Sequence, residues 1–432
     1  MNVRWISFIV VLSLLIAGCA GSPFVTQPAT SPQPPSATRD LPVSATATRS
    51  LPLAPTARGP VTLVVWLPPQ FDPASGTPAA LLLQRRLNEF GKQQPGVRIE
   101  IRVKAEEGTG GMLDSLFTAN AAAPLAVPDL IALPYPLLEL AALKGLLQTY
   151  DGLSTVLENP DWYDNARQMA TLQERTYGLP FAGDALALVY RPPIVPSPPL
   201  DWSAVLTSSV PLAFPAADPQ ALFTLTEYQS NGGQVRDEQG RPYLDYNVLV
   251  ELLTFFQECS VAGVMPYSIT QYQDYDQIWG AFTNADVDLA AIWSSQYLSQ
   301  LPAEAALALL PPPDATPFTL STGWVWALPA SELPSQEMSV KLAEFMVDRE
   351  FLAQWTPVAG YLPTRPSSLA GFSPPALQPV IESILLSAQV LPPVDIQASL
   401  GPPLEQATVQ VLKQQSDAAT AAQAALNALT AP

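Results

Sequence analysis

Histidine is absent from this chain of 432 residues, and cysteine occurs only at Cys19 and Cys259. Without an imidazole, the protein cannot use Ser–His or Cys–His catalysis, and it cannot bind zinc through histidine. Lys and Arg number 20 against 38 Asp and Glu, which gives a net charge of −18. Such an acidic surface disfavours nucleic acids and phosphorylated ligands. We therefore expect no nucleic-acid partner, no metal and no other cofactor.

Three short motifs that could carry chemistry are incomplete. Residues 108–111 are rich in glycine but lack the Lys-Ser/Thr pair of a phosphate-binding loop. Asp274 and Asp276 have a spacing compatible with calcium, without the loop glycine and terminal glutamate of that site. Glu106 and Glu107 are adjacent, so in an extended segment their side chains point to opposite sides. We interpret all three as solvated surface.

The chain begins with a short apolar run that ends in a cysteine. Arg4 precedes the uncharged residues 5–17, which are too few to span a bilayer comfortably. The sequence LIAGC at 15–19 resembles the signal of bacterial lipoproteins, which implies cleavage after residue 18 and lipidation of Cys19. The alternative is an ordinary secretory signal with an incidental cysteine. We predict that residues 1–18 are a lipoprotein signal peptide and that Cys19 anchors the chain to the extracytoplasmic face of the cell membrane.

Residues 19–60 are dominated by Pro, Ser, Thr and Ala. A segment of this composition cannot bury enough apolar surface to offset the entropy lost on ordering. We therefore predict a disordered linker between the lipid anchor and a folded part that begins at residue 61.

Candidate strands and helices alternate from residue 61 onward. The apolar run 61–66 predicts a buried strand, and Thr77-Pro78 predicts the start of a helix. Residues 97–103 alternate between apolar and polar side chains, as a half-exposed strand does. Further strands are expected at 129–133, 185–190, 210–214, 287–292 and 324–328, and helices near 110–122 and 137–147. This order predicts an α/β fold with largely parallel sheets.

A series of short motifs carries a family resemblance. They are VVW at 64–66 with EFGKQQPGV at 89–97, PDLIAL at 128–133, LAALKGLL at 140–147, YGLPF at 177–181 with VYR at 189–191, GGQVRDEQG at 232–240, and GYLPTR at 360–365. In this order they resemble the extracellular solute-binding proteins of ABC transporters, in the family that includes sugar binders of the maltose-binding type. Arg191 stands where that family usually has asparagine, and residues 396–432 lack the aromatic residue that often covers the ligand.

The resemblance implies a two-lobed, type II periplasmic-binding-protein-like fold. Each lobe would be a mostly parallel sheet flanked by helices, and a multi-stranded hinge would join the lobes. The expected N-terminal lobe is 61–185 plus 325–357, and the expected C-terminal lobe is 186–324 plus 358–432. The chain would cross between lobes near 184–188, 319–324 and 358–361.

Residues beside these crossings would face both lobes and hold a ligand in the cleft. By resemblance, Asp184 would accept hydrogen bonds from ligand hydroxyls, although it could equally be a solvated loop residue. Trp293 could stack on a sugar ring or belong to a lobe core, and Ser294 follows it at an expected helix start. The other ligand-binding candidates are Trp324, Tyr135, Trp66, Tyr361 and Arg365. Their alternatives are core packing for the tryptophans, and helix capping or a salt bridge for Tyr361 and Arg365.

Together these features predict a monomeric, lipid-anchored solute-binding protein that does no covalent chemistry. It would capture a small molecule, most favourably a sugar or oligosaccharide, and deliver it to the permease of an ABC importer. One alternative is a secreted hydrolase acting on carbohydrate or ester substrates. Another is a sensor or adhesin that works without a transporter.

Overall fold

The computed structural model describes residues 61–314, 316–330 and 335–430. The predicted signal peptide, Cys19 and the 19–60 linker lie outside the described residues. All of the described residues belong to a single structural unit, Arg58–Pro432. Within these ranges, no helix has both the length and the apolar character needed to cross a membrane.

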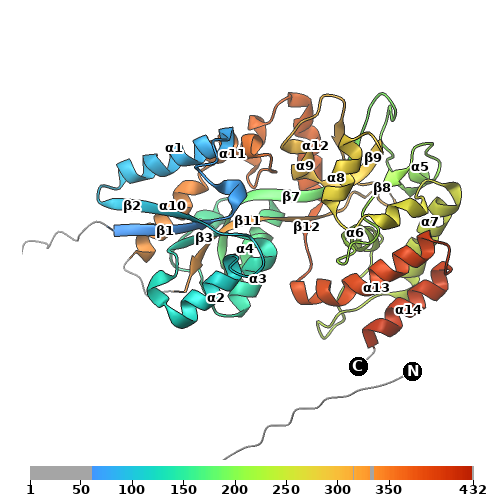
Figure 1. The fold of residues 1–432 in the computed structure, drawn as a ribbon, viewed down its shortest axis with the longest axis horizontal. Helices are drawn as coiled ribbons and strands as arrows, with labels where there is room; N and C mark the ends of the chain where they lie inside the picture. The colour runs from blue at the N-terminus through green and yellow to red at the C-terminus, as the bar shows by residue number, and fades with distance from the viewer. Residues whose placement is uncertain (1–60, 315, 331–334, 431–432) are drawn as a thin grey trace, which may run out of the picture. The chain divides into compact units, whose positions relative to one another are not determined.

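The first strands and helices form as their sequence patterns predict. β1 (Val61–Leu67) pairs in parallel with β2 (Val97–Val103) and with β3 (Leu130–Pro134). α1 (Pro78–Gln93) begins at Thr77, whose hydroxyl accepts a hydrogen bond from the Ala80 amide, and it buries Leu83, Leu87 and Phe90. α1 and α11 (Arg349–Ala359) lie on one side of these strands, while α2 (Met112–Ala122) and α3 (Tyr135–Leu143) lie on the other (Figure 1).

Two long strands connect the two parts of the main sheet, whose strand order is β2-β1-β3-β11-β7-β9-β8. β7 (Gly178–Tyr190) pairs first with β11 (Thr319–Pro329) and then with β9 (Leu289–Trp293). β11 also pairs with β3, and β8 (Leu212–Ala213) pairs with β9. The outer pairs β1–β2, β1–β3 and β8–β9 are parallel, as expected, whereas the pairs made by β7 and β11 in this order are antiparallel. The reason is that β7 leads from the first part of the sheet to the second and β11 leads back.

The remaining elements extend the sheet and cover it. The short strands are β4 (Leu147–Gln148), β5 (Thr171–Leu172), β6 (Arg175–Thr176), β10 (Ala306–Ala308) and β12 (Ala388–Val390). The other α-helices are α4 (Asp164–Ala170), α5 (Trp202–Leu206), α6 (Leu222–Ser230), α7 (Tyr246–Ala262), α8 (Tyr275–Thr283), α9 (Ser294–Leu298), α10 (Gln336–Met346), α12 (Gln378–Ser387), α13 (Val394–Leu412) and α14 (Ala418–Thr430). Short 3₁₀ helices occur at Pro69–Phe71, Pro124–Ala126, Val156–Glu158, Tyr267–Gln271, Pro366–Gly371 and Pro375–Leu377.

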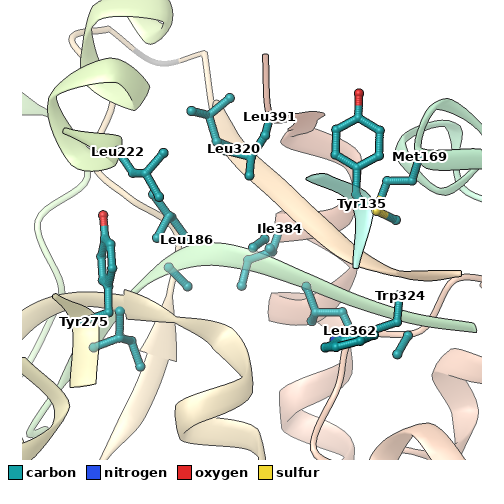
Figure 2. Close-up of a cluster of buried hydrophobic side chains, with 14 of the residues drawn as sticks. Tyr135, Met169, Leu186, Leu222, Tyr275, Leu320, Trp324, Leu362, Ile384 and Leu391 are labelled. Atoms are coloured by element: carbon teal, nitrogen blue, oxygen red, sulfur yellow. The ribbon is translucent and has the colours of Figure 1, made fainter. Parts of the chain in front are cut away.

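Buried apolar side chains fill the space around the β7–β11 pair. Figure 2 shows Leu186, Leu320, Ile384 and Leu391 near these strands, with Leu222 and Tyr275 toward one end and Tyr135, Met169, Trp324 and Leu362 toward the other. Each of these side chains is less than a tenth exposed. Burying one large apolar side chain contributes about 1.5–3 kcal/mol to folding, so this cluster fixes the central strands against their neighbours.

The segment at the third expected crossing is hydrogen-bonded to earlier parts of the chain. α11 ends at Gly360, whose φ of 75° is in the left-handed region that favours glycine. Leu362 then exchanges two backbone hydrogen bonds with Gly183, of 2.8 and 2.9 Å, and the Thr364 carbonyl accepts one from the Tyr163 amide. Gly183 and Tyr163 both lie in the range 61–185, which is part of the expected N-terminal lobe. The lobe boundaries themselves stay a prediction.

Candidate ligand-binding cavity

A cavity of about 490 Å³ opens where several strands end. Its walls come from both parts of the sheet and from the central strands. The lining residues are Glu106, Glu107, Pro134, Pro136, Leu137, Asp184, Asp218, Gln220, Leu222, Asp274, Tyr275, Asp276, Trp293, Ser295, Gln296, Thr322, Gly323, Trp324 and Leu391. Its volume is in the range typical of small-molecule sites.

The position of the cavity follows from the topology. Glu106 and Glu107 follow the carboxyl end of β2, and Pro134 ends β3. On the other side, Asp218 follows β8, and Trp293 ends β9. In open α/β sheets, ligands bind beyond the carboxyl ends of the strands, where loops from neighbouring strands converge. This cavity is therefore the best candidate for a binding site.

Asp184 lines the cavity from the middle of β7 and is held by the residues that follow β9. Its Oδ1 accepts hydrogen bonds from the Ser294 hydroxyl at 2.7 Å and the Ser295 amide at 3.0 Å. Its Oδ2 accepts one from the Ser295 hydroxyl at 2.5 Å. Burial raises the pKa of Asp184, and the hydrogen bonds from the two serines partly oppose that rise. The carboxylate thus fastens β7 to the start of α9 while it faces the cavity.

Ser294 does not line the cavity, because its side chain is fully buried behind Asp184. It donates to Asp184 and accepts from the Ala185 amide at 3.2 Å. The structure therefore assigns Ser294 to positioning Asp184, and it places Ser295 at the cavity instead.

Trp293 forms the wall opposite the β3 side and is partly exposed. Its ring centroid lies 5.8 Å from that of Tyr275, at the start of α8. Gln296 connects these two elements by donating to the Tyr275 carbonyl at 3.0 Å and to the Asp276 carboxylate at 2.9 Å. Two aromatic rings and two acceptor side chains thus share one wall.

Trp324 reaches the cavity from β11 at the end of an aromatic cluster. The Phe71 ring meets Trp324 edge-on at 5.0 Å, and Phe71 also lies 5.6 Å from Tyr361. Trp326 is 2% exposed and stacks on Phe181, so it belongs to the core. Trp324 is 7% exposed, which leaves only a small part of its surface toward the cavity.

Tyr361 lies behind the cavity rather than on its lining. Its ring lies 5.6 Å from that of Phe71, which also meets Trp324, and burial together with the nearby charges of Asp184 and Glu106 raises the pKa of Tyr361. The structure therefore brings Tyr361 next to the expected site residues, where it supports Trp324.

Three predicted site residues are placed elsewhere. Trp66 is 3% exposed, and its ring packs in the core with the Lys104 ammonium 4.9 Å from its centroid. Arg365 pairs with Asp161 at 3.6 Å and lies 3.7 Å from the Trp162 ring centroid, so its structural alternative, a salt bridge, is the arrangement observed. Tyr135 lines a separate cavity of about 800 Å³ on the other side of Leu391, and burial raises the pKa of its hydroxyl to about 12.

Sequence reasoning missed most of the acidic lining. The carboxylates in the lining are Glu106, Glu107, Asp184, Asp218, Asp274 and Asp276, and no Lys or Arg is found among the described residues that line this cavity. Several of them also cap local structure: Asp274 accepts from the Gln277 amide at 2.8 Å, and Asp218 accepts from the Leu222 amide at 3.0 Å. The signal that could have found them is their position just after predicted strands or at helix starts.

Other chemistry is not supported in the part of the chain that the structure describes. There, no cluster of His, Cys, Asp or Glu side chains is arranged to hold a metal ion. Cys259, on α7, is fully buried, and burial raises its pKa to about 12, so it is an inert core thiol.

Comparison with known proteins identifies the family of this chain. Residues 85–379, well over half of the chain, match the family described as bacterial extracellular solute-binding protein. No curated protein sequence matches the chain. Among solved structures, it is similar to the sugar-binding protein MalE from Xanthomonas citri, at 18% identity and a TM-score of 0.70 over 86% of this chain and 98% of that one.

Two further structures share the fold. The cyclic alpha-maltosyl-1,6-maltose binding protein from Arthrobacter globiformis has 17% identity and a TM-score of 0.70, over 86% of this chain and 98% of its own. A cyclo/maltodextrin-binding protein complexed with maltotetraose has 20% identity and a TM-score of 0.69, over 87% and 98%. They confirm the expected two-lobed α/β fold class. Since the family match spans most of the folded part, this chain belongs to the family of bacterial extracellular solute-binding proteins.

Proposed function

We propose that the cavity binds a neutral sugar or oligosaccharide, which the protein delivers unchanged to the permease of an ABC importer. The observation that carries this proposal is the make-up of the lining: Trp293 and Trp324 beside a set of carboxylates and amides, with no cation among the described lining residues. Aromatic faces pack against the apolar face of a sugar ring, and carboxylates accept hydrogen bonds from its hydroxyls.

The charge of the lining also supports a neutral ligand over an anionic one. A phosphorylated or acidic sugar would enter a cavity whose ionisable lining groups are carboxylates, and like charges at close range are unfavourable. The fold relatives are described as binding a sugar, cyclic alpha-maltosyl-1,6-maltose and cyclo/maltodextrin, and these descriptions support the same ligand class.

We further propose that the folded part works as a monomer tethered by lipid at Cys19, through the 19–60 linker, on the outer face of the cell membrane. The two lobes, 61–185 plus 325–357 and 186–324 plus 358–432, would close on the ligand about β7 and β11. Closure around a bound solute is the usual movement of two-lobed binding proteins.

Calorimetric titration of the detergent-solubilised full chain with a library of neutral, acidic and phosphorylated sugars tests the ligand class. We expect binding of one or more neutral sugars, with the ligand recovered chemically unchanged after long incubation. Binding confined to anionic sugars, or to no sugar, would overturn the proposal. Conversion of a sugar in excess over the protein would favour the hydrolase instead.

A further inference from the structure

A third cavity, of about 340 Å³, adjoins the candidate ligand-binding cavity on the β1–β3 part of the fold. Its lining consists of one loop and two helices. The residues are Glu106, Glu107, Gly108 and Gly111 from the loop, Leu113, Asp114 and Phe117 from α2, and Leu137 and Lys144 from α3 and its end. We call this cavity the α2–α3 groove.

The α2–α3 groove and the candidate ligand-binding cavity share part of their walls. Glu106, Glu107 and Leu137 line both of them. The two cavities therefore adjoin at these three residues, and a ligand that reaches past them from the cavity would enter the groove. The shared carboxylates provide hydrogen-bond acceptors at the junction.

The groove carries its own aromatic platform. Phe117 is 54% exposed, although it lies one turn from Leu113 on the same face of α2. The Lys144 ammonium is 5.7 Å from the Phe117 ring centroid. Lys144 is also the one basic residue among the described residues lining either cavity, and it adds a hydrogen-bond donor to a lining rich in acceptors.

We propose that the α2–α3 groove binds the further units of an oligosaccharide whose first units occupy the cavity, with Phe117 packing against one of the outer rings. This inference rests on the proposed function. It assigns the groove to a linear sugar chain, because the groove is continuous with the cavity and repeats its combination of an aromatic face with polar side chains.

Length series of sugars test the assignment. The probes are linear chains of one to six units built from α-1,4-linked glucose, β-1,4-linked glucose and β-1,4-linked xylose, titrated into the full chain by calorimetry. The variants are Phe117→Ala and Phe117→Tyr, which keeps a ring. Leu125→Ala serves as the matched control, since Leu125 is 94% exposed and lies outside the groove.

We expect the affinity of the wild-type protein to rise with chain length in at least one series. Phe117→Ala should weaken the longest bound sugars about five- to tenfold and leave the shortest bound sugar unchanged. Phe117→Tyr and Leu125→Ala should stay within about twofold of wild type at every length. An unchanged melting temperature of Phe117→Ala excludes a folding effect.

Two results would overturn the inference while the proposed function stands: affinity that does not depend on length, or Phe117→Ala binding every length like wild type. If no sugar of any series binds, the proposed function and this inference fail together. The first two outcomes require measurable sugar binding, so the two failures are distinguishable.

Discussion

Asp184 in the cavity wall and Glu227 in the core both have a pKa raised by burial, but their surroundings treat the carboxyl group differently. Asp184 accepts hydrogen bonds from Ser294 and Ser295 and faces the cavity. Glu227, on α6, is 2% exposed, and the one described donor to its side chain is the Trp202 indole at 2.7 Å. Burial raises the pKa of Glu227 from 4.5 to about 8.

The number of hydrogen-bond donors around each carboxyl group distinguishes Asp184, which is arranged for binding, from Glu227, which is only tolerated in the core. The hydrogen bonds to Asp184 oppose the rise in its pKa that burial causes, and its carboxyl oxygens can accept hydrogen bonds from ligand hydroxyls. Glu227 has too few donors to hold a charge, so it keeps its proton at neutral pH. Likewise Trp202 is covered by Phe255, with stacked ring centroids 4.4 Å apart, whereas Trp293 is partly open.

The largest effect is expected in the Glu227 core. Trp202→Ala removes a stacked ring that is 9% exposed and leaves Glu227 without that donor. We expect a loss of about 3–5 kcal/mol in the free energy of unfolding, measured by urea denaturation. Sugar affinity of the remaining folded protein should be unchanged. A variant with normal stability but weak binding would mean that the two regions have been assigned the wrong way round.

A pH dependence of stability is expected from Glu227. Because its folded-state pKa of about 8 exceeds the ordinary 4.5, the folded chain retains a proton that the unfolded chain releases. Stability should therefore fall as pH rises from about 4.5 to about 8, by at most about 1.4 kcal/mol per pH unit, and then level off.

Glu227→Gln should flatten this profile and exceed wild type in stability above pH 8. Glu251→Gln on α7, whose side chain is exposed, is the matched control and should follow wild type. Urea denaturation at intervals between pH 4 and pH 9 measures both. A Glu227→Gln profile as steep as that of wild type would show that Glu227 is ionised in the folded protein.

Asp184→Asn tests the cavity side of the comparison. Losing a charged acceptor should cost about 1.5–3 kcal/mol of binding, roughly ten- to over a hundredfold in Kd for the neutral sugar that binds wild type. Because the pKa of Asp184 is raised, wild-type binding should weaken on acidification from above the ordinary value of 3.8, as the carboxylate takes up a proton. The Asp184→Asn variant should not show this loss of sugar affinity at low pH when binding is measured by calorimetry over a pH series. Equal affinity of the two proteins would exclude Asp184 from the site.

The local sequence patterns predicted helices and strands correctly where an element has one buried face and one exposed face. Thr77-Pro78 starts α1, and the alternation at 97–103 is β2. The central strands were harder. The expected strand at 185–190 is the second half of β7, whose first half pairs with a different region. That extension depends on partners far away in the sequence, and no local pattern records them.

The site was predicted in part for a similar reason. Asp184, Trp293 and Trp324 lie at the cavity because their positions in the chain are tied to the crossings and strand ends. Trp66 and Arg365 also lie near strand ends or crossings, yet their side chains turn into the core and toward Asp161. The direction of a side chain depends on the neighbours that pack against it, which a single sequence does not contain.

Trp293→Ala has the smallest expected effect on sugar binding. It also distinguishes most clearly between a cavity-wall tryptophan and a core tryptophan. As a cavity wall residue it should lose about 1–2 kcal/mol of sugar binding, roughly five- to thirtyfold in Kd, by calorimetry. Its melting temperature should stay near that of wild type, because the ring is partly exposed and packs mainly against Tyr275. Trp202→Ala, a tryptophan truncation on α5, should show the reverse pattern. If Trp293→Ala instead melts far lower and its folded fraction binds normally, Trp293 is a core residue, and the ligand must be held by the opposite wall at Glu106, Glu107 and Leu137.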